Sequence, residues 1–164
     1  MRRTLIMVAA LAAAVLAGSA SIAPARAVTS TNFTVTLRLT VTDIQCGLGC
    51  TAYVTGQAVV PRIGPATITG FVSAGCSDNP PEPDLCQRYF DVGVLGNNAR
   101  QLTINGGTSW LQGERIPPGT WTASGAGFLG SGTETTEPSD PLGLRLLRVG
   151  DPVAISLMGT LLPA

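Results

Sequence analysis

Between residues 33 and 42 the chain alternates apolar and polar side chains without interruption. The apolar positions are Phe33, Val35, Leu37, Leu39 and Val41, and threonine or arginine stands between them. Because successive side chains of a β-strand point to opposite faces of the sheet, this pattern predicts a strand with one buried face. Beyond the first 27 residues no segment shows a convincing helical period, which favours an all-β fold.

Other segments rich in β-branched and aromatic residues predict strands at 51–60, 66–74, 87–95, 100–105, 108–111, 120–125 and 153–161, with a further candidate at 144–148. Turns are expected at 61–65, 96–98 and 105–107. Residues 130–141, which are rich in Gly, Thr, Glu and Pro, are expected to form an exposed mobile loop. The spacing predicts a single immunoglobulin-like β-sandwich of about 7–9 antiparallel strands.

The first 27 residues have the features of a secretory signal peptide. Arg2 and Arg3 precede an apolar run over residues 5–17, and Ala25-Arg26-Ala27 supplies the small residues of a cleavage site. We expect cleavage after Ala27 and one secreted domain over residues 28–164, extracellular or associated with the cell envelope. No membrane span is expected in this mature chain.

Composition narrows the classes of function. All ten acidic residues but only seven of the ten arginines lie beyond position 27, so the mature chain carries a net charge of −3. This balance argues against nucleic acid and anionic membranes as partners. The chain has neither histidine nor lysine, which excludes a Ser-His-Asp triad, a Schiff base and histidine metal ligation. We predict a non-enzymatic protein without a cofactor.

Four cysteines lie in the exported part: Cys46, Cys50, Cys76 and Cys86. An even number in an oxidising compartment predicts disulfides. Of the three connectivities, we favour Cys46 with Cys50 and Cys76 with Cys86, because each pair closes a short loop between predicted strands. A four-thiolate zinc site is the alternative, but its ligands usually stand closer in sequence, and we predict no metal.

The segment between Cys76 and Cys86 is acidic and stiffened by proline. We predict a partner-binding loop formed by Asp78, Pro80, Pro81, Glu82, Asp84 and Leu85. The alternatives are a calcium site made of the three carboxylates and an ordinary surface connection. A second acidic group, Glu134, Glu137 and Asp140, is interpreted as a solvated charge run rather than a cation site.

Trp110 and Trp121 are the two tryptophans of the chain. With Tyr53 and Tyr89 they could form a flat platform for sugar rings, and the alternative is burial against the sheet. Glycoside hydrolysis needs two facing carboxylates rather than histidine, and the candidates in the sequence are Asp43, Asp91, Glu114 and Asp151.

The nine-residue spacing between Cys76 and Cys86 in an exported chain of this size resembles that of the neocarzinostatin-like apoproteins. That resemblance implies an immunoglobulin-like chromophore carrier with two local disulfides. The order differs, since the longer-spaced pair comes first in that family and second here, and no ligand residue is transferred.

The sequence therefore predicts an exported, non-enzymatic β-sandwich protein that binds an unknown protein or glycan at or outside the cell surface. The alternatives are a protease inhibitor that uses the disulfide-tethered loop and a carboxylate-based, glycan-active enzyme.

Overall fold

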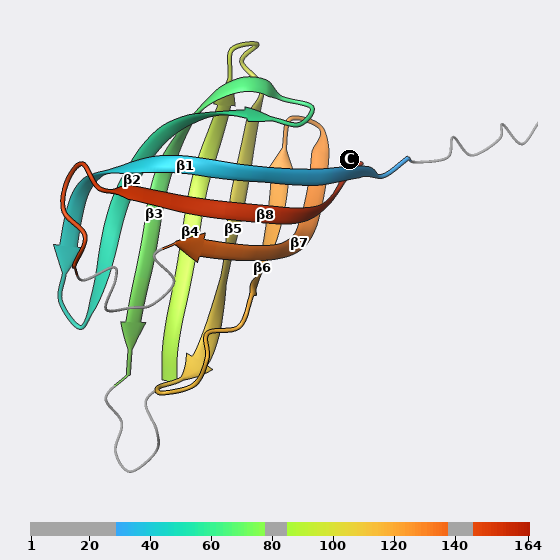
Figure 1. Cartoon of the computed structure of the whole chain (residues 1–164). Coiled ribbons are helices and arrows are strands. Elements are labelled where there is room, and N and C mark those ends of the chain that lie inside the picture. Colours follow the sequence, from blue (N-terminus) through green and yellow to red (C-terminus); the bar gives the residue numbers. More distant parts are fainter. Residues whose placement is uncertain (1–28, 78–84, 138–145) are drawn as a thin grey trace, which may run out of the picture.

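The computed structural model describes residues 29–77, 85–137 and 146–164. Every strand is antiparallel to its neighbour in sequence (Figure 1). The eight strands are β1 (Thr31–Cys46), β2 (Gly49–Val60), β3 (Gly64–Cys76), β4 (Leu85–Gly96), β5 (Gln101–Leu111), β6 (Gly119–Gly125), β7 (Phe128–Glu137) and β8 (Pro152–Pro163).

The sheet closes into a barrel in the order β1 to β8. Strand β1 is long enough to pair on both edges: Thr31–Thr40 pairs with β8, and Leu39–Cys46 pairs with β2. The all-β, antiparallel prediction is confirmed, whereas the predicted immunoglobulin-like sandwich, also implied by the neocarzinostatin resemblance, is wrong. Alternation within strands shows which side chains are buried, but it does not show that the first strand pairs with the last.

The barrel is flattened, so that two groups of strands cross. In Figure 1, β1, β7 and β8 run across the front at a steep angle to β3, β4 and β5 behind them. This crossing makes the closed sheet look like two layers, with the core between them. The predicted sandwich and the observed barrel can therefore bury the same face of a strand such as β1, whose alternation is local.

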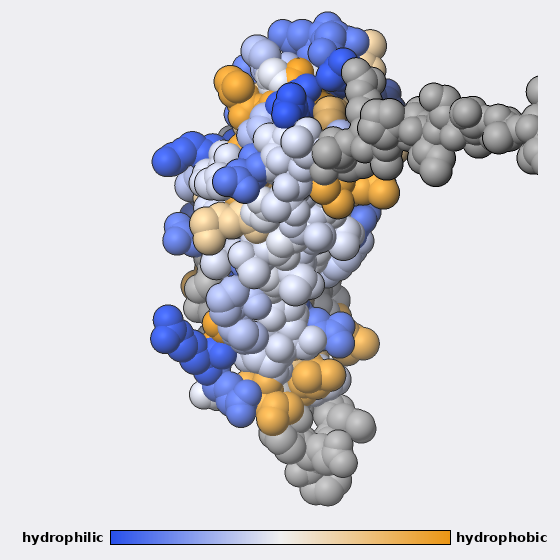
Figure 2. Space-filling view, turned by 90° about the vertical axis from the view of Figure 1, so that its right-hand side faces the viewer, coloured by the Kyte–Doolittle hydropathy of each residue, from blue (hydrophilic) through white to orange (hydrophobic). Residues whose placement is uncertain are grey.

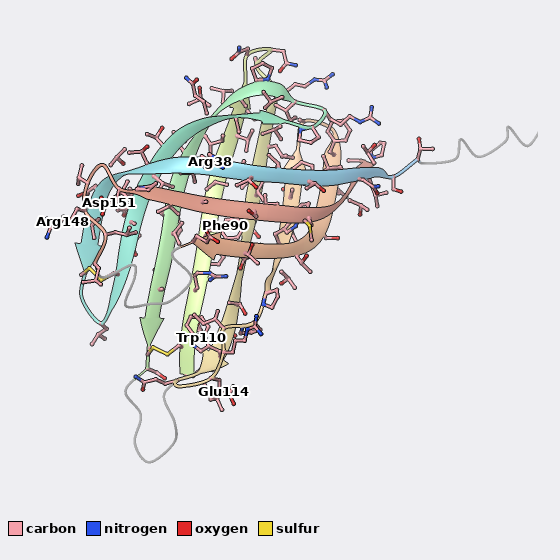
Figure 3. The ribbon with its side chains drawn as sticks, viewed as in Figure 1. Arg38, Phe90, Trp110, Glu114, Arg148 and Asp151 are labelled. Atoms are coloured by element: carbon pink, nitrogen blue, oxygen red, sulfur yellow. A yellow bond between two sulfur atoms is a disulfide. The ribbon has the colours of Figure 1, made fainter. Side chains whose placement is uncertain are left out.

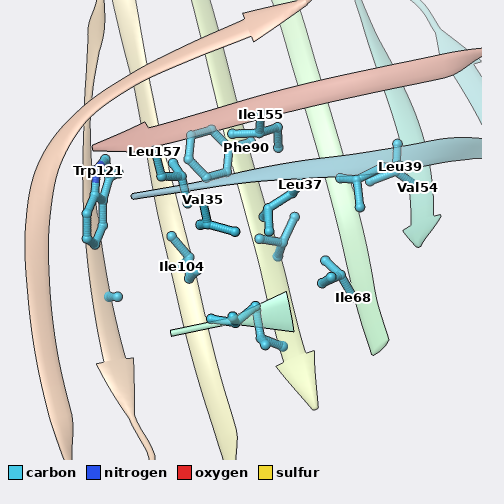
Figure 4. Close-up of a cluster of buried hydrophobic side chains, with 14 of the residues drawn as sticks. Val35, Leu37, Leu39, Val54, Ile68, Phe90, Ile104, Trp121, Ile155 and Leu157 are labelled. Carbon is cyan, nitrogen blue, oxygen red and sulfur yellow. The ribbon is translucent and has the colours of Figure 1, made fainter. Parts of the chain in front are cut away.

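Apolar side chains from the strands meet inside the barrel (Figure 4). Fully buried members include Leu37, Ile68, Phe90, Ile104 and Ile155. The outward positions are rich in hydroxyl side chains that face each other across strands, as in the 3.0 Å contact between the Thr36 and Ser156 hydroxyls. Figure 2 shows the side that carries β6 and β7; the middle of that surface is mostly of intermediate hydropathy.

Trp121 spans part of the inner wall by lying over glycines. Around the barrel, Trp121 is paired with Gly132, Gly132 with Gly159 and Gly159 with Phe33. The two glycines leave room for the indole to reach Phe33, and the ring centroids are 5.1 Å apart. The indole N–H donates to the Met158 carbonyl at 3.1 Å. The ring contact joins β6 to β1, and the hydrogen bond joins β6 to β8. The glycines on β7 and β8 leave the space that the indole occupies.

The expected loop at 130–141 is wrong over its described part, because residues 130–137 belong to β7. The inward positions of β7 include Gly130, Gly132, Glu134 and Thr136. None of these four side chains is apolar, and the apolar inward residue Phe128 stands before them, so residues 130–137 lack the pattern by which the other strands were recognised. Its buried neighbours come from other strands, chiefly Trp121 and Arg88.

Two of the three predicted turns are confirmed and one is wrong. The turns expected at 61–65 and 96–98 are observed at 61–63 and 97–99, with hydrogen bonds from Ile63 N–H to Val60 O at 3.0 Å and from Ala99 N–H to Gly96 O at 3.0 Å. The expected turn at 105–107 is wrong, since β5 runs straight through it. A side chain on Gly106 or Gly107 would collide with the backbone of a neighbouring strand, so these glycines permit close strand approach. Residues 146–148 form no strand.

Both disulfides have the predicted pairing. Cys46 is bonded to Cys50 and Cys76 to Cys86, and within each pair the residues are also cross-strand partners. They fasten the ends of the β1–β2 and β3–β4 hairpins at the same end of the barrel (Figure 3). Two disulfides indicate an oxidising environment.

An ion pair lies inside the barrel. Arg88 of β4 donates from Nη2 to Glu134 Oε1 of β7 at 2.8 Å, and both side chains are almost fully buried. The Thr136 hydroxyl donates to Glu134 Oε2 at 2.9 Å. The expectation that Glu134 is a solvated loop charge is therefore wrong. Gly119, which is paired with Glu134, makes room for the carboxylate, since a side chain there would collide with Oε1.

Replacing Gly159 by alanine should strongly destabilise the barrel. The added methyl group would collide with the Ser131 carbonyl and come within 2.8 Å of the Trp121 ring. We expect the free energy of unfolding, measured with denaturant, to fall by about 1–3 kcal/mol. Gly93→Ala is the matched control, because the nearest atom to its methyl group would be 3.8 Å away. Equal effects of the two substitutions would contradict the packing described for Trp121.

Glu134→Gln should lower the free energy of unfolding by about 3–5 kcal/mol, since it leaves the Arg88 charge buried without its carboxylate. The double variant Arg88→Met/Glu134→Met should recover most of that loss, because it removes both charges and keeps apolar volume. Denaturant unfolding of the two variants and the wild type measures this. A double variant as unstable as Glu134→Gln would contradict the explanation that the loss of stability comes from the buried Arg88 charge.

Candidate functional site

Apolar side chains fill the core of the barrel, and a hollow of about 530 Å³ lies beside the buried Arg88 and Thr136. The exposed aromatic side chains lie on the outer surface. Three aromatic rings lie there side by side on consecutive strands: Tyr53 on β2, Phe71 on β3 and Tyr89 on β4. The ring centroids are 6.4 Å apart for Tyr53 and Phe71 and 5.9 Å apart for Phe71 and Tyr89. We call these three residues the aromatic row.

The alternation of side chains along each strand places the aromatic row on the outer surface of the barrel. Each ring alternates with buried neighbours, as Tyr53 does with Ala52 and Val54, so it projects from the polar face of its strand. Tyr53 is 38% exposed and Tyr89 is 43% exposed, so both rings present part of their surface to solvent. Tyr53 is directly paired with Phe71, and the long ladders on both sides of β3 hold the rings in place.

Two hollows of about 390 Å³ each flank Tyr89, and both are lined by Tyr89 and Gln87. The first, called the Thr120 hollow, extends over β5 and β6. The second, called the Ser73 hollow, extends over β2 and β3 toward the disulfide end. The outward residues of the Thr120 hollow are Asn105, Gly107, Ser109, Thr120 and Thr122, and those of the Ser73 hollow include Leu48, Ser73, Gly75, Ser77 and Leu85.

Hydrogen bonds orient polar groups around the aromatic row. The Thr122 hydroxyl donates to Asn105 Oδ1 at 2.9 Å, and the hydroxyls of Thr51 and Ser73 lie 3.1 Å apart. The Tyr89 hydroxyl donates to Asp91 Oδ2 at 3.5 Å. Partial burial raises the pKa of the Tyr89 phenol, and the charge and hydrogen bond of Asp91 raise it further. Tyr89 is therefore a neutral donor at physiological pH.

Both tryptophans expected for a ligand platform are buried. Trp121 is 1% exposed and lies in the core, and Trp110 is 7% exposed. Neither offers a ring face to solvent, which corresponds to the burial alternative considered for them. The rings on the surface are instead the two tyrosines, joined by Phe71, which the sequence interpretation missed. The sequence signal for Phe71 is an aromatic residue at a strand position that alternates with buried positions and therefore faces outward.

Most of the predicted partner-binding loop falls outside the described residues. Asp78, Pro80, Pro81, Glu82 and Asp84 belong to this part, so their role stays a prediction. Leu85 is the first residue of β4, is 43% exposed and lines the Ser73 hollow. It is the cross-strand partner of Leu111, which is 38% exposed.

The candidate catalytic carboxylates have separate surroundings. Asp43 accepts the Ile44 N–H at 2.8 Å, and Asp151 accepts the Arg148 N–H at 2.8 Å. Asp91 adjoins the aromatic row, and Figure 3 shows Glu114 well apart from Asp151. Within the described ranges, no three acidic or cysteine side chains gather in a way that could hold a metal ion.

Comparison of the chain with protein-family models, with curated proteins and with solved structures gave no match. Among the described residues no helix is long and apolar enough to cross a membrane.

Tyr89 should ionise above the ordinary tyrosine pKa of 10.0. Since the folded state holds this proton more tightly than the unfolded chain does, the contribution of Tyr89 to stability should decline as the pH rises past 10.0. In a Tyr53→Phe background, tyrosinate absorbance reports Tyr89 alone. Adding Asp91→Asn should lower the midpoint of that titration, and an unchanged midpoint would contradict the assigned influence of Asp91.

Proposed function

We propose that the protein is an exported, non-enzymatic binding protein whose ligand is a carbohydrate, held on the aromatic row and in the two hollows beside it. The observation that carries this proposal is the exposure of Tyr53 and Tyr89, aligned by Phe71 on the polar face of the sheet. A pyranose has an apolar face of C–H bonds, which packs on an aromatic ring, and a rim of hydroxyls, which needs polar partners.

The surroundings of the aromatic row supply those partners. Asn105, Thr120 and Thr122 line one hollow, and Ser73 and Gln87 line the other. Amides and hydroxyls both donate and accept hydrogen bonds, as sugar hydroxyls do. Asp91 adds a carboxylate next to Tyr89, which accepts bonds from hydroxyls.

A carbohydrate fits this surface better than a protein partner. The core of a protein interface is usually a broad, well-packed apolar patch. Here the apolar surface is a narrow line of rings, with hydroxyl and amide side chains in the Thr120 hollow and Leu48 and Leu85 as separate apolar side chains in the Ser73 hollow. Because the rings stand on central, fully paired strands, their positions are set before the ligand arrives, which lowers the entropic cost of binding.

The proposal that the protein is not an enzyme is supported by the residue types present. The chain has no histidine or lysine. Beside the aromatic row, Asp91 has no acidic neighbour among the described residues that line the two hollows. Glycoside hydrolysis uses a pair of carboxylates that flank the scissile bond.

Export follows from the predicted signal peptide and is supported by the two disulfides, which need an oxidising compartment. A binding protein outside the cell meets polysaccharides of envelopes and of the surroundings. The proposed ligand is therefore available where the protein would be found.

Tyr89→Ala should weaken carbohydrate binding at least about tenfold, the loss expected when a central aromatic contact is removed. The measurement is retention of the purified protein on insoluble cellulose, xylan, mannan and chitin and on acidic polysaccharides, followed by titration with the polymer that binds. Tyr89→Phe should keep most of the affinity because the ring remains.

Met158→Ala is the control, since Met158 is 59% exposed and projects from β8, across the barrel from β4. It should bind as the wild type does. Failure of every polysaccharide to bind, or equal loss with Met158→Ala and Tyr89→Ala, would overturn the proposed function.

A further inference from the structure

Tyr89 forms a ridge between the Thr120 hollow and the Ser73 hollow. Its ring contributes to the lining of both hollows, as does Gln87 two residues earlier on the same face of β4. The hollows therefore lie on opposite sides of one strand and share a wall. A ligand that reaches both hollows must therefore cross Tyr89.

The aromatic row crosses the strands beside the Ser73 hollow and not through it, because Tyr89 is paired with Ser73 whereas Phe71 is paired with Asp91. From Tyr89 the rings continue through Phe71 on β3 to Tyr53 on β2. On the other side of Tyr89, its cross-strand partner is Gly107, which has no side chain to block the way to Thr120 on β6. The surface is therefore an open path over β2 to β6 and not a closed pocket.

The outward side chains of both hollows are uncharged. Arg88 contributes to the Thr120 hollow, but its side chain is 2% exposed and points inward to Glu134. The ionised group at the ridge is Asp91, whose negative charge repels carboxylates and sulfates. Recognition of an acidic polysaccharide would need arginines or lysines on the path, and the described residues lining the hollows supply none that point outward.

We propose that the ligand is a linear, uncharged polysaccharide that crosses strands β2 to β6, with one sugar stacked on Tyr89 and its neighbours on either side in the two hollows. This inference rests on the proposed function and specifies its ligand. It predicts at least three consecutive sugar subsites, one at the ridge and one in each hollow.

Chain length tests the subsites. The probes are oligosaccharides of one to six residues cut from the neutral polymer that binds in the polysaccharide assay, titrated by calorimetry against the full chain. We expect the dissociation constant to fall at least about tenfold between one and three residues and then to level off. Equal dissociation constants for the monosaccharide and the hexasaccharide would overturn the inference.

Variants in each hollow test the path. Asn105→Ala in the Thr120 hollow and Ser73→Ala in the Ser73 hollow should each weaken hexasaccharide binding about threefold to tenfold. Thr135→Ala, an exposed change on β7, should leave it unchanged. Thermal unfolding of each variant confirms that it folds, and Thr122→Val provides a second substitution in the Thr120 hollow. No effect in either hollow would overturn the inference.

The two proposals fail differently. If a carbohydrate binds and Tyr89→Ala weakens it, but chain length has no effect or an acidic polymer is preferred over every neutral one, the proposed function stands and the inference falls. If no carbohydrate binds, both fall.

Discussion

The structure depends on the double pairing of β1. Its first half forms a ladder with β8 and its second half forms one with β2, so the sheet has no free edge. Closure gives every strand an inner and an outer face, and the inner faces are filled by apolar side chains. Barrels that carry a ligand inside leave that space open, whereas this one places Trp121, Phe33 and Phe90 there. The proposed carbohydrate site therefore lies on the outer surface.

Two kinds of contact hold the crossed walls of the barrel together. Trp121 reaches Phe33 over two glycines, and Arg88 reaches Glu134 over Gly119. In both cases the absence of a side chain on one strand gives space to a long side chain from another. The aromatic row shows the opposite arrangement on the outer surface, where consecutive strands each present a ring. The second disulfide joins β3 and β4, and complete ladders pair β3 with both β2 and β4, so the positions of these rings are fixed by the sheet.

The sequence revealed the strands whose inner positions are apolar, such as β1 and β8, because alternation is a local property. It also indicated the two disulfides, since short loops brought the cysteines together. Strand β7 escaped detection because its inner positions include Gly132 and Glu134, whose partners come from elsewhere in the fold. The candidate site was visible in part: Tyr53 and Tyr89 drew attention as aromatic residues. Their alignment with Phe71 depends on the registers of three strands, which local pattern does not supply.

Closure through β1 and β8 also has a consequence for how the chain folds. The hydroxyls of Thr36 and Ser156 meet across this seam although they are 120 positions apart in the sequence. As the chain is made or moved to another compartment, the first strand therefore keeps one edge without its native neighbour until the last strand arrives. Contacts between adjacent strands close short loops, whereas the ladder between β1 and β8 joins residues as distant in the sequence as Thr36 and Ser156, a separation that slows the formation of such contacts. During that interval the exposed edge is the part of the molecule most prone to pair with another copy.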